Sequence, residues 1–375
     1  MEIKIKKDLP RALSLSITAI FFISLSNIIV AQQNTWLKTE IDKIIRFDTE
    51  INYKDVPGFI IGIIDGDSTY FYSFGTRETR KNSGQLNKHD IFEIGSVSKL
   101  YTAQVVRVLD KEGKLSLNDE VNNYLPGKYR NPRLNHLTVK DLLNHQSGFS
   151  LRPEMFGARE LDSQNPYLYY NRENLLYYYY NYIPETNGFI YSHTNYAILE
   201  EIIQQVTGLD YNDVVYEYIN KTCNLTNTFV DFPEQKENYI APGYDKYRKK
   251  VKPWTFSSFR ASEGIKTSAD DAVLFIKFLL FQNDLNPAAM EVIVAKEDKP
   301  DKSFNKQLYI ENGWNIITVK GKKVSVHTGR TSGHSCFMGM VKDTKTAVIV
   351  MSNSWIGTED LGMQILRLIN QNWKF

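Results

Sequence analysis

Strand-type and helix-type patterns follow one another along this chain in an order that restricts the folds open to it. Residues 56–78 contain two β-rich runs divided by Asp65-Gly66-Asp67, which is a hairpin signal. Strand patterns return near the C-terminus, where residues 314–329 predict a hairpin turning at Gly321 and residues 335–354 predict a second strand pair. Strands at both ends with helices between them predict one sheet assembled from the two termini.

Helical patterns fill the middle of the chain. Residues 96–112 and 192–207 each precede a glycine, Gly113 and Gly208, at the position where glycine commonly ends a helix. Thr138-x-x-Asp141 resembles a capping box that starts a short helix. Two further helices are expected, one capped near Ser268 and one over residues 358–373.

These patterns together predict an α/β (α+β) fold. Its antiparallel sheet is built from N- and C-terminal strands and flanked by helices, and a mostly helical lobe, about residues 115–300, is inserted between the sheet-forming ends. The main domain is expected to cover residues 34–375 of the 375-residue chain.

The first 31 residues differ from the rest. A basic start, an apolar stretch from Ala12 to Ala31 and a polar continuation are the order of an export signal, with Ala31 as the last residue removed. Because the apolar stretch is long enough to span a bilayer, an uncleaved anchor is the alternative. The chain is therefore expected to be periplasmic or extracellular, and to meet a membrane only if this segment is retained.

Composition excludes several functions. The 45 Lys and Arg balance 43 Asp and Glu to a formal charge of +2, which predicts no nucleic-acid partner. Six scattered His and two Cys offer no metal-ligand spacing, so no metal is expected. The chain has no P-loop and no G-x-G-x-x-G motif, and no other cofactor is expected either. Cys223 and Cys336 are interpreted as two buried free thiols, although an exported chain could bridge them.

Ser96 and Lys99 form the strongest chemical candidate. They are three positions apart where an apolar run becomes a helix, so their side chains share one helical face. A buried lysine can act as a base towards a serine hydroxyl, and N–H groups at a helix N-terminus favour an oxyanion. Ser303 and Lys306 repeat the spacing in a polar stretch without a helix, so the four-residue pattern alone proves little.

Five segments carry a family resemblance: "FEIGSVSKLYTA", "LTVKDLLNHQSGFS", "YSHTNYAILEEII", "EGIKTSADDAVLFIKFLL" and "VHTGRTSGHSCFMG". In this order, from about Phe59 to Ser354, they closely resemble the serine β-lactamase-related superfamily. That superfamily includes class C β-lactamases, penicillin-binding proteins, D-aminopeptidases and serine esterases. The resemblance implies a β-lactamase/transpeptidase-like fold.

By this resemblance Ser96 matches the family nucleophile, Lys99 its partner base and Tyr191 the tyrosine of the Y-x-N motif. His193 replaces the usual Asn of that motif, which puts its contact with a substrate amide in doubt. Strict Y-x-N also occurs elsewhere, at Tyr129, Tyr169, Tyr179 and Tyr218, but only Tyr191 precedes the expected helix.

His327, Thr328 and Gly329 resemble the K-T-G triad on the strand beside the nucleophile. His in place of Lys occurs in the esterase and aminopeptidase branches, and it is expected to make the positive charge pH-dependent near neutrality. The backbone N–H of Arg330 would complete an oxyanion hole with that of Ser96, while its guanidinium is expected to point to solvent rather than to pair a carboxylate.

The implied function is acyl transfer by an exported serine hydrolase. The substrate is a small molecule or a peptide, for which cell-wall material is a reachable source. His327 and His193 favour an esterase or a D-amino-acid peptidase or carboxypeptidase over an efficient β-lactamase. A class C-like β-lactamase and a non-hydrolysing penicillin sensor remain the alternatives. His145 is interpreted as a packing or turn residue, and the tyrosines of residues 167–181 as a packed or half-exposed helix face.

Overall fold

The computed structural model describes residues 35–49, 56–80, 83–153, 165–184, 189–281, 292–295, 308–319 and 321–371. They belong to two compact units, Met1–Asp48 and Thr49–Phe375, and in the first of them residues 35–47 form a helix. The expected export signal and the Ser303–Lys306 pair lie outside the described residues. Within the described ranges, no helix is both long and apolar enough to cross a membrane.

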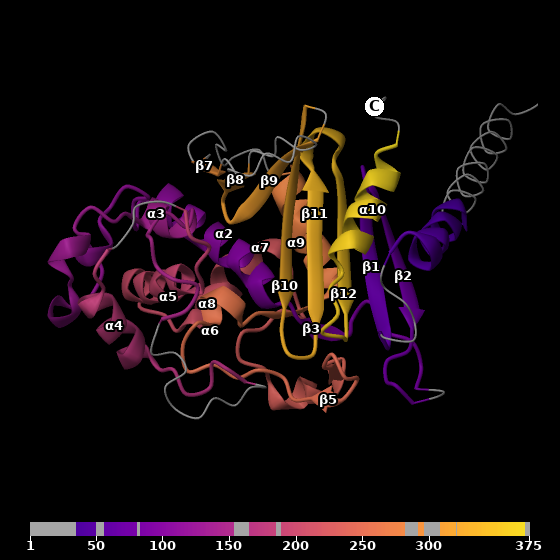
Figure 1. Cartoon of the computed structure of the whole chain (residues 1–375), viewed down its shortest axis with the longest axis horizontal. Helices are drawn as coiled ribbons and strands as arrows, with labels where there is room; N and C mark the ends of the chain where they lie inside the picture. The colour runs from indigo at the N-terminus through magenta and orange to yellow at the C-terminus, as the bar shows by residue number, and fades with distance from the viewer. Residues whose placement is uncertain are drawn as a thin grey trace, which may run out of the picture. The chain divides into compact units, whose positions relative to one another are not determined.

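One eight-stranded sheet dominates the second unit, with the strand order β2-β1-β12-β11-β10-β9-β8-β7 and antiparallel neighbours throughout. The strands are β1 (Gly58–Asp65), β2 (Ser68–Gly75), β7 (Val292–Ala295), β8 (Leu308–Glu311), β9 (Trp314–Val319), β10 (Lys322–Arg330), β11 (Ser335–Val341) and β12 (Thr346–Ser352). Figure 1 shows the indigo N-terminal strands beside the yellow C-terminal ones.

The two ends of the sheet meet at β1 and β12. Phe59 pairs with Ser352 and Asp65 with Thr346, and both strands are buried almost throughout because helices cover the sheet. Gly66, with a φ of +57°, turns β1 into β2 as the hairpin signal predicted. The prediction of a sheet built from both termini is confirmed.

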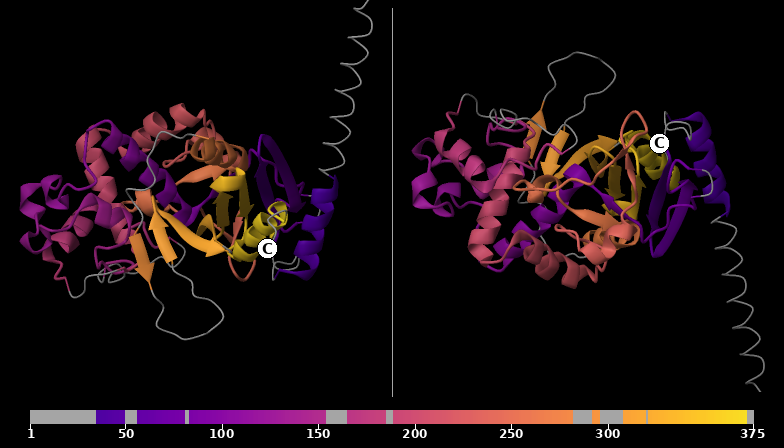
Figure 2. Two further views of the ribbon diagram at one scale, coloured as in Figure 1. Left: turned by 90° about the horizontal axis from the view of Figure 1, so that it is seen from above. Right: turned by 90° about the horizontal axis from the view of Figure 1, so that it is seen from below.

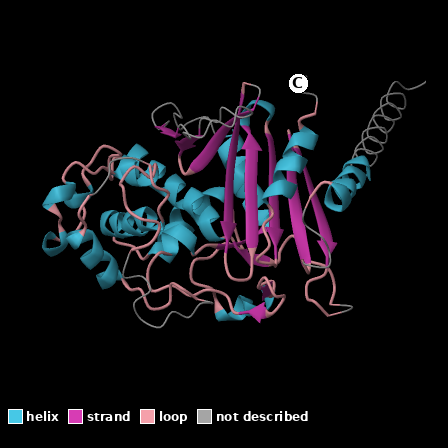
Figure 3. Cartoon of the chain, viewed as in Figure 1, coloured by secondary structure: helices cyan, strands magenta, loops and turns pink. Residues whose placement is uncertain are grey.

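Helices lie on both faces of this sheet. The helices α9 (Ala269–Phe281) and α10 (Glu359–Ile369) both contact β12. Figure 3 shows α10 in front of the sheet and α9 behind it. Because apolar side chains of a central sheet need cover on each side, this three-layer arrangement buries the strands that carry the site.

The remaining helices gather beside the sheet, as both views of Figure 2 show. They are α2 (Ser98–Lys111), α3 (Val139–Leu143), α4 (Arg172–Asn181), α5 (His193–Thr207), α6 (Tyr211–Val215), α7 (Lys221–Cys223) and α8 (Arg260–Glu263). Two small sheets pair β3 (Ile91–Glu93) with β6 (Lys266–Ser268) and β4 (Gly243–Tyr244) with β5 (Lys250–Val251).

Helix ends follow the local signals. The capping box of Thr138 and Asp141 starts α3, and Ser268 Oγ accepts a hydrogen bond from the Asp271 N–H at the start of α9. Gly208 ends α5 in the left-handed conformation. The tyrosines of α4 differ in burial, since Tyr179 is buried and Tyr177 is exposed.

Candidate active site

Ser96 lies in a single 3₁₀ turn, η1 (Gly95–Val97), that leads directly into α2. Gly95 has a φ of +50°, a conformation that side chains rarely adopt, so glycine allows the sharp entry. Lys99 follows one turn later, and its Nζ is 3.3 Å from Ser96 Oγ. Lys99 is fully buried while Ser96 is partly exposed, so the hydroxyl is the member of the pair that a substrate can reach.

Strand β10 packs its backbone against this turn. A Cβ atom added to Gly329 would lie 1.9 Å from the Ile94 carbonyl oxygen and 2.8 Å from the Ser96 nitrogen. A Cβ added to Gly95 would likewise lie 2.6 Å from the Arg330 nitrogen. Only glycines permit this approach, which brings the backbones of Ser96 and Arg330 together. Two such backbone N–H groups can stabilise an oxyanion.

Glu263, at the end of α8, is a buried carboxylate that the sequence analysis did not identify. Ser96 Oγ donates a hydrogen bond to Glu263 Oε1, and Lys99 Nζ donates to the same oxygen over 3.1 Å. The only sequence signal for Glu263 is an acidic residue between Ser262 and Gly264 in a segment that resembles the family. A carboxylate in contact with both Ser96 and Lys99 makes the site a triad.

Tyr191 lies beside this triad, surrounded by three imidazoles. Lys99 Nζ is 5.2 Å from the centre of the Tyr191 ring. The ring centroids of His145, His193 and His327 are 4.5, 5.8 and 6.4 Å from that of Tyr191. Among the described residues, no hydrogen bond joins the Tyr191 hydroxyl to Ser96 or Lys99, so the contact is made by the ring.

The three histidines are held neutral. Burial, reinforced by the nearby Lys99 charge, lowers the pKa of His145 and His193 well below the usual value. The same two causes lower the pKa of His327 to about 3. The expectation that His327 carries a pH-dependent charge near neutrality is therefore wrong, because its ring is buried next to a cation.

His327 has a defined tautomer. Its Nδ1 lies 2.8 Å from the Thr328 carbonyl oxygen, which can only accept, so Nδ1 carries the proton. The lone pair of Nε2 is buried, and within the described part of the chain it finds no hydrogen-bond partner. This arrangement offers a substrate or the Tyr191 hydroxyl an acceptor. It does not offer a substrate carboxylate a cation.

His193 and His145 are held by hydrogen bonds. His193, the first residue of α5, places Nδ1 2.9 Å from the Tyr167 hydroxyl and 3.3 Å from Glu263 Oε1. His145 Nδ1 accepts a hydrogen bond from the Ser192 N–H over 3.1 Å. His145 therefore acts as the turn-bonding residue that the sequence suggested, and the fold also places it against Tyr191.

The guanidinium of Arg330 does not point freely to solvent, which corrects the sequence-based expectation. Its Nη2 lies 3.2 Å from Glu359 Oε1, and its Cζ lies 4.7 Å from the centre of the Trp355 ring. The side chain is turned away towards α10 because β10 alternates its faces, so only the backbone of Arg330 lies beside Ser96.

Two other features lie apart from the triad. Cys223 and Cys336 are both free and buried, which confirms the interpretation as two thiols.

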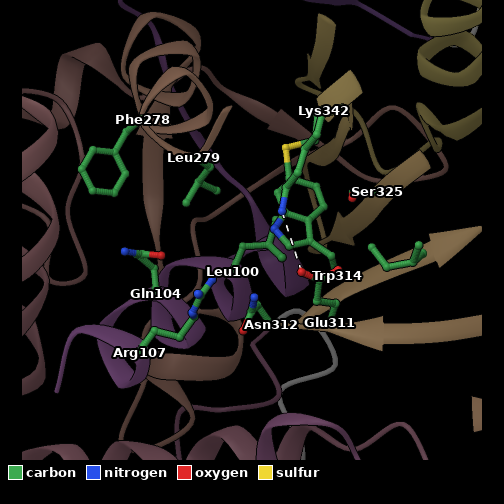
Figure 4. Close-up of a pocket in the computed structure, with 12 residues that line it drawn as sticks. Leu100, Gln104, Arg107, Phe278, Leu279, Glu311, Asn312, Trp314, Ser325 and Lys342 are labelled. Carbon is green, nitrogen blue, oxygen red and sulfur yellow. Dashed lines mark ion pairs between the residues drawn. The ribbon is translucent and has the colours of Figure 1, made fainter. Parts of the chain in front are cut away.

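A cavity of about 50 Å³ lies beside α2. Its lining includes Leu100, Gln104 and Arg107 of α2 and residues of α9 and of the neighbouring strands β8 to β11. Figure 4 shows it with the Lys342–Glu311 ion pair, and Ser96 is not among its lining residues.

A serine hydroxyl that contacts a buried lysine at a helix start, packed against the glycine of strand β10 in an antiparallel sheet, is the arrangement of a serine hydrolase. The chain belongs to the beta-lactamase family, since the family model described as Beta-lactamase matches residues 46–369.

Individual relatives are distant. The beta-lactamase of Providencia stuartii is 21% identical over 92% of this chain and 91% of its own length. That of Pseudomonas fluorescens is 25% identical over 64% of this chain, and the match spans 62% of the relative. The solved beta-lactamase/D-alanine carboxypeptidase of Pseudomonas syringae superposes with a TM-score of 0.74 at 17% identity, covering 91% of this chain and 99% of that one. This structural likeness shows the shared fold.

Proposed function

We propose that this protein is an exported serine hydrolase that cleaves an ester or amide through an acyl-enzyme on Ser96. The observation that carries the proposal is the 3.3 Å contact between Lys99 Nζ and Ser96 Oγ at the start of α2. An activated serine with an adjacent basic group is the arrangement that acyl transfer requires. The expected export signal, residues 1–31, favours a substrate outside the cytoplasm.

In the proposed reaction, Ser96 Oγ attacks the substrate carbonyl carbon while the N–H groups of Ser96 and Arg330 hold the developing oxyanion. Lys99 and Tyr191 move protons between the serine and the leaving group. Water then adds to the acyl carbon and releases Ser96. No step in this sequence calls for a cofactor.

The residues at positions 327 and 193 favour some of the family's substrates over others. Where the family motif carries a lysine, His327 is buried and neutral, so the site lacks that fixed cation for a substrate carboxylate. His193 replaces the amide-binding Asn and is already engaged with Tyr167 and Glu263. Both changes favour small esters and D-amino-acid amides over substrates recognised through a carboxylate, a group that includes β-lactams and the C-terminal peptides of a carboxypeptidase.

Family membership keeps β-lactam hydrolysis as the second candidate. A non-hydrolysing penicillin sensor would use the same serine but retain the acyl group. These candidates differ in a measurable way, because a hydrolase releases product continuously whereas a sensor gives one stoichiometric burst.

The test uses covalent probes on the purified protein. A fluorophosphonate and a fluorescent penicillin are applied to the wild type, Ser96→Ala and Ser303→Ala, the last being a control with the same four-residue pattern. We expect labelling to disappear only in Ser96→Ala, and p-nitrophenyl esters or D-amino-acid amides to turn over faster than a chromogenic cephalosporin. Undiminished labelling of Ser96→Ala would disprove the proposal.

A further inference from the structure

Two donors converge on one oxygen of Glu263. Ser96 Oγ–H and Lys99 Nζ donate to Oε1, and His193 Nδ1 lies 3.3 Å from it. We propose that Glu263 is a catalytic residue: its carboxylate, and not an uncharged Lys99, is the first acceptor of the Ser96 proton. This inference rests on the proposed function, since it assigns a base to the same nucleophile.

The hydrogen bonds of Lys99 identify its charge state. Nζ has three partners, Ser262 O at 3.1 Å, Glu263 Oε1 at 3.1 Å and Ser96 Oγ at 3.3 Å. An ammonium group has three N–H donors and satisfies all of them, whereas a neutral amine has two donors and a lone pair that would need the proton that Ser96 donates to Glu263. A lysine in this state stabilises a serine alkoxide but has no lone pair with which to take the proton.

The hydroxyl of Ser96 is oriented for proton transfer to Glu263. Its proton points to Glu263, and its oxygen accepts an N–H of Lys99. This is the orientation that a nucleophile needs before proton transfer, because a lone pair of the oxygen stays available for the carbonyl carbon. The Glu263 carboxylate is therefore in direct hydrogen-bond contact with Ser96 Oγ, the atom that attacks the substrate.

Glu263 is held in place by the packing of α8. Thr102 Oγ1 donates to the Ala261 carbonyl over 2.6 Å, and the Ala261 N–H donates to Glu200 Oε2 over 3.0 Å. Ser98 Oγ accepts from the Ile265 N–H over 3.0 Å. These bonds fix both ends of the segment that carries Glu263 to α2 and α5, so the carboxylate is preorganised against Ser96.

Every proton that moves in the reaction is accounted for by the triad and Tyr191. As Ser96 Oγ bonds to the carbonyl carbon, its proton moves to Glu263 and the carbonyl π electrons move to the oxyanion. When the bond to the leaving group breaks, the departing atom takes a proton from the Tyr191 hydroxyl, which recovers one from the Lys99 ammonium. The Glu263 carboxylic acid then returns its proton to the Lys99 amine, 3.1 Å away, and both starting charges are restored.

The experiment measures the rate of Ser96 phosphonylation by a fluorophosphonate and the rate of Ser96 acylation from the burst with a p-nitrophenyl ester, both in the full chain. Glu263→Gln keeps the side-chain shape but cannot accept a proton, and we expect acylation to fall about 10²–10⁴-fold. Glu263→Asp retains the carboxylate, one methylene shorter, and should be intermediate. Glu201→Gln is the matched control, since Glu201 on α5 pairs with Arg172 away from the triad. It should acylate like the wild type.

Chemical rescue separates proton transfer from mere positioning. Formate and acetate should restore acylation of Glu263→Ala, and the rescued rate should rise with the pKa of the added acid, because the carboxylate takes the proton in the rate-determining step. Wild-type acylation rates in Glu263→Gln, or an absence of rescue in a folded Glu263→Ala, would overturn the inference while leaving the function of Ser96 intact. If the wild type itself is not acylated on Ser96, the proposed function fails and this inference fails with it.

Discussion

Lys99 Nζ lies 3.1 Å from Glu263 Oε1, and the two side chains are 0% and 2% exposed. Removing two charges from water is costly, and such a pair is rarely the most stable filling for a protein interior. The pair is therefore best explained by its contact with the Ser96 hydroxyl. The effect of the pair on the free energy of unfolding can be tested separately from its effect on catalysis.

Lys99→Met should destabilise the protein by about 3–5 kcal/mol, because it leaves Glu263 buried and unpaired. Adding Glu263→Gln to that variant should recover most of the free energy of unfolding, since it removes the uncompensated charge. Activity should stay absent in both. Urea unfolding and ester turnover measure the two effects, and a double variant as unstable as the single one would contradict this explanation.

Gly329→Ala should abolish turnover and lower stability, because the new Cβ would lie 1.9 Å from the Ile94 carbonyl oxygen. The strand must then move away from η1, and the Arg330 N–H moves with it; losing one oxyanion donor costs about 10²–10³-fold in kcat. Gly127→Ala is the control, as its Cβ meets nothing within 4 Å. Equal kinetic effects of the two substitutions would refute the close approach.

Tyr191→Phe should lower kcat about 10²–10⁴-fold through loss of a proton carrier, with little change in melting temperature, because the ring contacts to Lys99 and the three histidines remain. Tyr177→Phe, on an exposed position of α4, should leave turnover unchanged. Full activity in Tyr191→Phe would remove this hydroxyl from the mechanism.

Acid should destabilise the protein through His327. Its pKa is about 3 in the folded state and about 6.5 when unfolded, so between these values the unfolded chain binds more protons. Stability is therefore lost as the pH falls below about 6.5, and His327 alone accounts for about 2 kcal/mol between pH 7.5 and 5. His327→Gln should reduce the change in the free energy of unfolding between pH 7.5 and 5 by about 2 kcal/mol. The exposed His136→Gln should not, and a profile unchanged by His327→Gln would contradict the neutral ring.

Most of the fold could be predicted because its signals are local. The turn at Gly66, the capping box at Thr138 and the glycine end of α5 each depend on residues within a few positions, and the structure confirms all three. The strand patterns at both ends predicted one sheet built from the two termini, while the pairing of β1 with β12 came only from the structure.

The surroundings of the site were less accessible to prediction. The charge of the His327 position could not be read from its residue type, because its pKa depends on burial and on Lys99. The direction of the Arg330 side chain also depended on a partner, Glu359, that lies on the distant helix α10.

Local sequence signals specified the turn at Gly66, the capped start of α3, the glycine end of α5 and the serine that precedes a lysine near a helix start, because periodicity, caps and turns act over short stretches of chain. Only the tertiary structure decided that Glu263, 167 positions after Ser96, meets its hydroxyl. Hydrogen bonds and charge–charge interactions depend on distance in space, and that distance is set by the packing of α8 against α2 and α5.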